Sequence, residues 1–122
     1  MTDIFIDPTK SNIAVQITSQ SLHALGFEIT VFGTDGSTII EHFTGDTESN
    51  KSFTKILENK PSASKGYYIR GTFTVISPDG KDYPYSILFS ILEDKMVIKP
   101  NITLSDTTTA GKDTTGATYH IN

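Results

Sequence analysis

The chain has 122 residues, the length of one domain, and contains no cysteine. Disulfides, thiolate zinc sites and cysteine nucleophiles are therefore excluded. The net charge is -4 and the basic residues are scattered singly, so we expect no nucleic-acid partner, because phosphates require clustered positive charge. No segment approaches the roughly 20 apolar residues of a membrane span, and the N-terminal residues lack a signal-peptide pattern. We therefore expect no transmembrane segment and a cytoplasmic protein, or a secreted one without a visible signal.

Alternation of apolar and polar residues predicts two half-buried strands in the first third of the chain, at 12–19 and 25–32. The short run at 3–6 predicts a further strand before them. Residues 31–43 predict a hairpin, because Asp35-Gly36 tolerates the positive φ of a tight turn. The returning half of this hairpin alternates less regularly, which is typical of an edge strand or of a bulge.

Two longer alternating runs, 66–77 and 83–92, flank the segment Pro78-Asp79-Gly80-Lys81. Proline presets one turn residue and glycine supplies the unusual φ of another, so we expect these runs to pair as a hairpin. Residues 96–104 predict another strand, bent or placed at an edge by Pro100. The run 53–59 has helical spacing and predicts one short helix or an irregular strand.

These elements predict an all-β fold, an antiparallel β-sandwich of about seven to eight strands, either immunoglobulin-like or a jelly roll. Residues 1–104 form the expected sandwich domain. Residues 105–116 are small and polar, which is typical of a flexible loop or linker. Residues 117–122 alternate again and predict either a C-terminal strand, on its own sheet or a neighbour's edge, or a frayed tail.

Catalytic motifs are missing from the sequence. There is no Gly-x-Ser-x-Gly elbow, and Gly111-Lys112 lacks the remaining residues of a phosphate-binding loop. The three histidines, His23, His42 and His120, have no metal-binding spacing, so we interpret each as solvent-facing or structurally bonded. We expect no enzyme, no cofactor and no metal site. Residues 46–58 fail the EF-hand pattern, and a calcium site is not expected from four acids in two loops, Asp79, Asp82, Glu93 and Asp94.

Exposed aromatic and apolar side chains are the better candidates for binding. Tyrosine suits surfaces that are apolar on one side and wet on the other, and Leu88 and Leu92 share a face with serines, as interface residues often do. The structural alternative is that the tyrosines are cross-strand pairs that stabilise the hairpin. The predicted binding residues are Tyr67, Tyr68, Tyr83, Tyr85, Leu88, Leu92 and Tyr119.

The segment GTFTVISPDGKDYPYSILFSI, residues 71–91, resembles the strand-turn-strand core of small membrane-active sandwiches, the aegerolysins and actinoporins. The resemblance covers about a sixth of the chain. It implies a lipid-recognising sandwich, although the tryptophans that those families place at the lipid surface are missing here.

The sequence thus favours a non-catalytic module that binds or self-assembles through a sheet edge near the C-terminal strand or through the tyrosine hairpin. The expected partner is a protein, either self or another chain. The alternative is a lipid- or carbohydrate-recognising module of lectin-like or cytolysin-like type. A hydrolase that uses His42 with a carboxylate ranks last.

Overall fold

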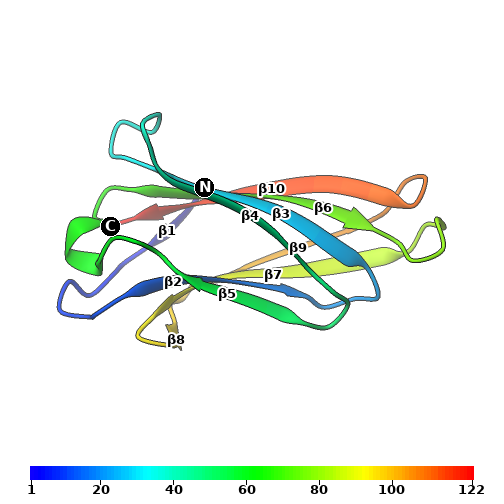
Figure 1. Cartoon of the computed structure of the whole chain (residues 1–122), viewed down its shortest axis with the longest axis horizontal. Coiled ribbons are helices and arrows are strands. Elements are labelled where there is room, and N and C mark those ends of the chain that lie inside the picture. The colour runs from blue at the N-terminus through cyan, green and yellow to red at the C-terminus, as the bar shows by residue number, and fades with distance from the viewer.

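The computed structural model describes residues 1–122 and is a sandwich of two packed β-sheets (Figure 1). The all-β prediction is confirmed, with ten strands rather than seven or eight. The strands are β1 (Thr2–Ile4), β2 (Ile13–Ser19), β3 (Ala24–Phe32), β4 (Ile39–Thr47), β5 (Ser52–Ile56), β6 (Tyr68–Ile76), β7 (Pro84–Glu93), β8 (Met96–Val97), β9 (Ile102–Thr107) and β10 (Lys112–Ile121).

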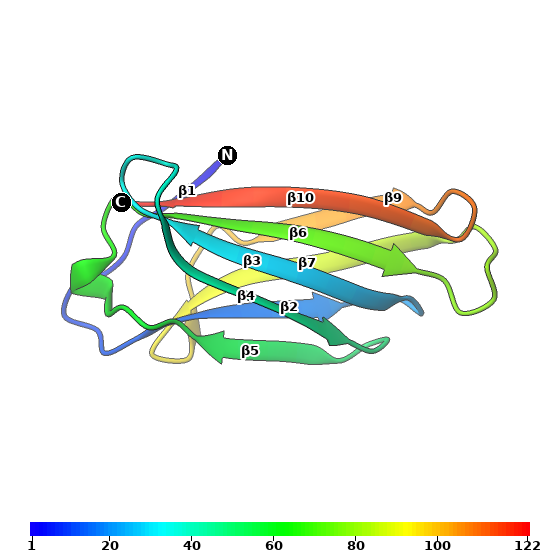
Figure 2. The same ribbon diagram turned by 45° about the horizontal axis from the view of Figure 1, so that its top comes forward.

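Each sheet contains strands from both halves of the chain (Figure 2). Sheet A has the order β1-β10-β6-β3-β4, and sheet B has the order β5-β2-β7-β8, with β9 also paired to β7. Strand β1 runs parallel to β10, and the other pairs are antiparallel. Chain segments distant in sequence therefore meet on one surface.

The alternating apolar residues of both sheets point inward and form one core. At its centre the Phe89 ring packs edge-to-face against the rings of Phe73 and Tyr119, which come from the opposite sheet. All three side chains are fully buried. Burial of a side chain of this size stabilises a fold by roughly 1.5–3 kcal/mol, so this aromatic group is a main contact between the two sheets.

The hairpin expected at residues 31–43 is confirmed. Strands β3 and β4 pair antiparallel, and their register shifts between Val31 and Phe32. Strand β4 is also an edge strand of sheet A. The turn depends on Asp35, whose Oδ1 accepts hydrogen bonds from the Ser37 and Thr38 amides, and on Gly36, which has a φ of 72°.

The hairpin expected between 66–77 and 83–92 is wrong. Strand β6 lies in sheet A between β10 and β3, and β7 lies in sheet B between β2 and β9. The turn at Pro78–Lys81 therefore crosses from one sheet to the other. Its ends bond to the β9–β10 turn, with the Ser77 amide on the Gly111 carbonyl at 2.8 Å and the Gly111 amide on Asp82 Oδ1 at 2.8 Å. The Asp-Gly chemistry specifies a chain reversal but not which strand receives the returning chain.

The flexible loop expected at 105–116 is wrong for most of its length, because β9 continues to Thr107 and β10 starts at Lys112. Strand β10 pairs with β6 from Lys112 to His120. Threonine is β-branched and fits a strand that is half exposed, so this small and polar composition is compatible with a strand. The C-terminal residues 117–121 belong to the same strand and dock on the chain's own sheet.

The short helix expected at 53–59 is also wrong. Residues Ser52–Ile56 form β5, an edge strand of sheet B, and a single 3₁₀ turn follows at Pro61–Ala63. The apolar residues of this segment alternate in burial rather than following a helical face, since Phe53 packs against Phe27 and Phe43. The competing alternative, an irregular strand, is the one that formed.

Candidate functional site

The outer face of sheet A carries an aromatic row at the end of the sheet where β1 pairs. The strand register aligns the residues Asp3, His120, Tyr68, Phe32 and Ile39 side by side across five strands. We call this set the aromatic row. Each member comes from a different strand, so only the assembled sheet brings them together.

Two contacts hold the aromatic row in place. The Tyr68 and His120 rings stack with centroids 4.5 Å apart and an interplanar angle of 17°. His120 Nδ1 lies 3.1 Å from Asp3 Oδ1, and the Asn122 side-chain amide donates to the same oxygen at 3.3 Å. The imidazole is thus fixed between a carboxylate and a phenol ring.

Arg70 occupies the next row of the face and stacks on Phe32, with its guanidinium carbon 5.1 Å from the ring centroid. It is the only arginine of the chain and takes part in none of its ion pairs. A guanidinium has five N–H donors, so an exposed one without a carboxylate partner has donors available for a ligand.

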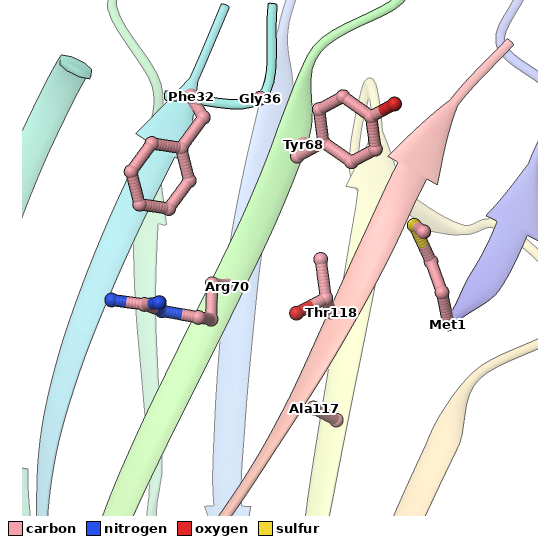
Figure 3. A pocket seen from close by; sticks show the side chains of 7 residues that line it. All are labelled: Met1, Phe32, Gly36, Tyr68, Arg70, Ala117 and Thr118. Atoms are coloured by element: carbon pink, nitrogen blue, oxygen red, sulfur yellow. The ribbon is translucent and has the colours of Figure 1, made fainter. Parts of the chain in front are cut away.

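These side chains surround an open hollow of about 450 Å³. Figure 3 shows Phe32, Tyr68, Arg70 and Thr118 arranged around it from three neighbouring strands, with Met1 on the far side. Pockets of about 300–1,000 Å³ are the size that small ligands use. The hollow is therefore large enough for a small ligand, and its lining is part aromatic and part polar.

A second hollow of about 340 Å³ lies on the same face, over the rows that follow Arg70. Threonine hydroxyls and the carboxylate of Glu28 line it, and Gly26 adds no side chain to its floor. Glu28 Oε1 lies 3.4 Å from His42 Nε2, and both side chains are about half exposed. The outer face of sheet A thus has an aromatic, cationic end and a polar, acidic middle.

The seven residues predicted from sequence do not form one site. Tyr68 lies in the aromatic row. Tyr67 is half-buried against the core, and Tyr83 donates to Asp79 Oδ2 at 2.6 Å, which raises the pKa of Tyr83. Tyr85 and Tyr119 are buried. The expected cross-strand tyrosine pairs do not exist, because β6 and β7 are in different sheets.

The two leucines predicted as interface residues lie on the outer side of sheet B. Leu88 is half-buried between Thr18 and Thr103, and Leu92 is buried within the chain beside Ala14 and Val97. Leu92 thus has no free surface to offer a partner.

The histidines occupy three different environments. His42 and His120 are on the outer face of sheet A, as described above. His23 is fully buried beside the rings of Tyr83 and Tyr85, and burial lowers its pKa. The four acids considered for calcium are split between the two ends of β7. Asp79 and Asp82 precede the strand, while Glu93 and Asp94 at its end accept hydrogen bonds from the amides of Asp7, Ser11 and Asn12.

Sequence reasoning missed Asp3, Phe32, Arg70 and His120 as site residues. The available signal was the polar side of the alternating pattern, where Arg70 and Tyr68 fall on the same face. What the pattern did not contain was the register that places Phe32 and His120 beside Tyr68.

None of the protein-family models, curated proteins or solved structures compared with this chain matches it. No helix in the structure is long and apolar enough to cross a membrane.

Proposed function

We propose that this protein is a non-catalytic binding module that takes a carboxylate-bearing saccharide on the outer face of sheet A. The observation that carries the proposal is the unpaired Arg70 guanidinium stacked on Phe32, at the rim of a hollow that Tyr68 also lines. Of the two ligand classes that the sequence suggests as alternatives, lipid and carbohydrate, this observation favours carbohydrate.

The chemistry of a sugar matches this lining. A pyranose has C–H groups on its faces and hydroxyls at its rim, so it packs its faces on aromatic rings and hydrogen-bonds through its edges. Phe32 and Tyr68 supply the rings. The threonine hydroxyls and Glu28 of the second hollow supply donors and acceptors for a neighbouring sugar unit.

A carboxylate on the sugar is favoured because Arg70 has no acidic partner in the chain. The guanidinium fork binds a carboxylate through two parallel hydrogen bonds, and hydrogen bonds to charged groups contribute about 1.5–3 kcal/mol each. A neutral sugar would leave this interaction unused.

Binding without catalysis is proposed because the face is open to water. His42 and Glu28, the acid-base pair on this face, are each about half exposed, and both hollows open to solvent. General acid-base chemistry usually depends on groups that the site shields and orients.

The test is calorimetric titration with two matched oligosaccharide sets, one containing uronic acids and one their neutral parents. We expect preference for the uronic set, and Arg70→Gln should lower its affinity by about 10-fold to 100-fold while changing the neutral set little. Tyr68→Ala should weaken both sets. Lys112→Gln, which removes one positive charge from the far end of the same face, is the control and should change neither.

The proposal is wrong if Arg70→Gln binds the uronic set as tightly as the parent protein does. Vesicles of anionic phospholipid, titrated against the same variants, distinguish the lipid alternative. Vesicle binding that requires Tyr68 in a chain that binds neither sugar set would replace the saccharide by a lipid surface.

A further inference from the structure

Strand β10 has an open edge over most of its length. It pairs with β6 from Lys112 to His120, but on its other side β1 covers only Tyr119–Ile121 (Figure 2). No strand of the chain pairs with Lys112–Thr118 on that side. A strand edge of this kind presents backbone groups to which another strand can add.

The hydrogen-bond pattern shows which residues point toward the open side. The Ile121 amide donates to the Tyr67 carbonyl at 2.8 Å, and the Ser77 amide donates to the Gly111 carbonyl at 2.8 Å. The backbone N–H and C=O groups of odd-numbered residues in β10 therefore bond to β6. Those of even-numbered residues point away from β6, toward the open edge. Lys112 exchanges both of its bonds with Thr109 in the preceding turn, so Thr114 and Gly116 are left with outward backbone groups that face no strand.

The opposite edge of sheet A, strand β4, carries features that discourage pairing. Strand β4 has a register shift and the inward-pointing Glu41, whose carboxylate accepts a bond from the Glu58 amide. Proline, bulges and inward-pointing charges are recognised ways of blocking an edge. The β10 edge has no proline and no register shift.

We propose that this edge binds a second copy of the chain, with β10 antiparallel to the partner's β10 about a two-fold axis at Thr115. The two limits of the open edge determine which residue lies at the centre of this pairing. Met1 and β1 limit the run near Thr118, the β9–β10 turn limits it at Lys112, and Thr115 lies midway. The open segment of β10 can therefore pair along its whole length with the same segment of a second copy. No feature of this edge favours an unrelated peptide instead.

In this register Thr114 lies opposite the partner's Gly116, and the two pairs related by symmetry exchange four backbone hydrogen bonds. Asp113 lies opposite the partner's Ala117, and Lys112 opposite the partner's Thr118. No like charges oppose one another. The two copies of sheet A then form one continuous sheet, which places the two outer faces proposed to bind saccharide side by side. The dimer does not depend on the saccharide proposal.

The dimer is expected to be weak. The seven residues from Lys112 to Thr118 of each copy bury less than the about 1,000 Å² that a stable interface needs, so we expect half-dimerisation at roughly 0.1–1 mM. Sedimentation equilibrium of the full chain up to about 1 mM covers this range.

The decisive variant is Thr114→Pro, because proline removes an outward N–H and places its ring on the open side without losing a bond to β6. The matched control is Thr54→Pro on the β5 edge. The Leu57 amide bonds to the Ile13 carbonyl at 2.8 Å, so odd residues of β5 bond to β2 and the Thr54 N–H also points outward. We expect Thr114→Pro to be monomeric at every concentration and Thr54→Pro to dimerise like the parent.

A second variant keeps the test decisive if Thr114→Pro fails to fold. Residues facing each other on the axis form a pair without mutual hydrogen bonds, about 4.5 Å apart at Cα, within the range of a disulfide. Thr115→Cys in this cysteine-free chain should therefore oxidise to a covalent dimer, and Thr74→Cys, from the neighbouring strand β6, should not. A parent chain that stays monomeric at about 1 mM, a Thr114→Pro protein that dimerises like the parent, or a Thr115→Cys protein that stays monomeric on oxidation would each overturn the proposal.

Discussion

The Tyr119 hydroxyl donates a hydrogen bond to the Phe89 carbonyl at 2.5 Å, from sheet A to sheet B through the middle of the core. The rings of Tyr119 and Phe89 also pack edge-to-face, with centroids 5.0 Å apart. One side chain thus joins the two sheets by both an apolar and a polar contact.

Removing that hydroxyl should destabilise the sandwich without opening a large cavity. For Tyr119→Phe we expect a loss of about 1 kcal/mol in the free energy of unfolding, the usual net value of one buried hydrogen bond. Denaturant unfolding measures it.

The same variant should change the stability at alkaline pH. Burial raises the pKa of Tyr119 from 10.0 to about 12. A phenol whose pKa is raised on folding favours the native state below pH 10, and this contribution is lost as the pH rises from 10 to 12. The parent protein should lose stability more steeply than Tyr119→Phe over that window, and equal slopes would contradict the role of this group.

Gly71 should tolerate no side chain. A Cβ built there would lie 2.6 Å from Phe73 Cζ and 3.0 Å from Phe89 Cε2, within the aromatic group that joins the sheets. Gly71→Ala should cost about 1–3 kcal/mol through overpacking. The control is Gly26→Ala on the neighbouring strand, where the nearest heavy atom is 4.0 Å away. Thermal unfolding of both variants tests this, and equal melting temperatures would contradict it.

His23 should make the fold sensitive to mild acid. Burial lowers its pKa below the usual 6.5, so the unfolded chain takes up a proton at a higher pH than the native protein does. The contribution of His23 to the free energy of unfolding is therefore present above pH 6.5 and is lost as the pH falls below 6.5. Unfolding free energies from pH 8 to pH 5 should fall less steeply for His23→Gln than for the exposed control His42→Gln.

Asp35 should titrate near pH 2. A hydrogen bond from the Thr38 hydroxyl, together with bonds from the Thr38 and Ser37 amides, lowers the pKa of Asp35 from 3.8 to about 2. The turn's contribution to stability is therefore present above pH 3.8 and is lost between pH 3.8 and 2. Carboxyl chemical shifts followed by NMR should show this midpoint, and Thr38→Val should move it upward.

Local signals in the sequence predicted most strands and one hairpin correctly. The alternation of Ile13, Val15 and Ile17 reports which side of a strand is buried, and that information is complete within a few residues. The Asp35-Gly36 turn is equally local, since its hydrogen bonds and its positive φ involve only neighbouring residues.

The candidate site could be predicted only in part, because it depends on register and sheet membership. Tyr68 was found from its residue type, but its neighbours His120 and Phe32 are placed by pairing with β10 and β3. The same limit explains the failed hairpin at Gly80 and the failed loop over Thr114. Strand identity is set by the residues of the strand, whereas the choice of partner is set by burial of the whole chain. The sequence by itself determined that this protein is built of strands with one buried side. Only the tertiary structure decided which strands meet, and so which side chains share the face where Arg70 lies free of any acid.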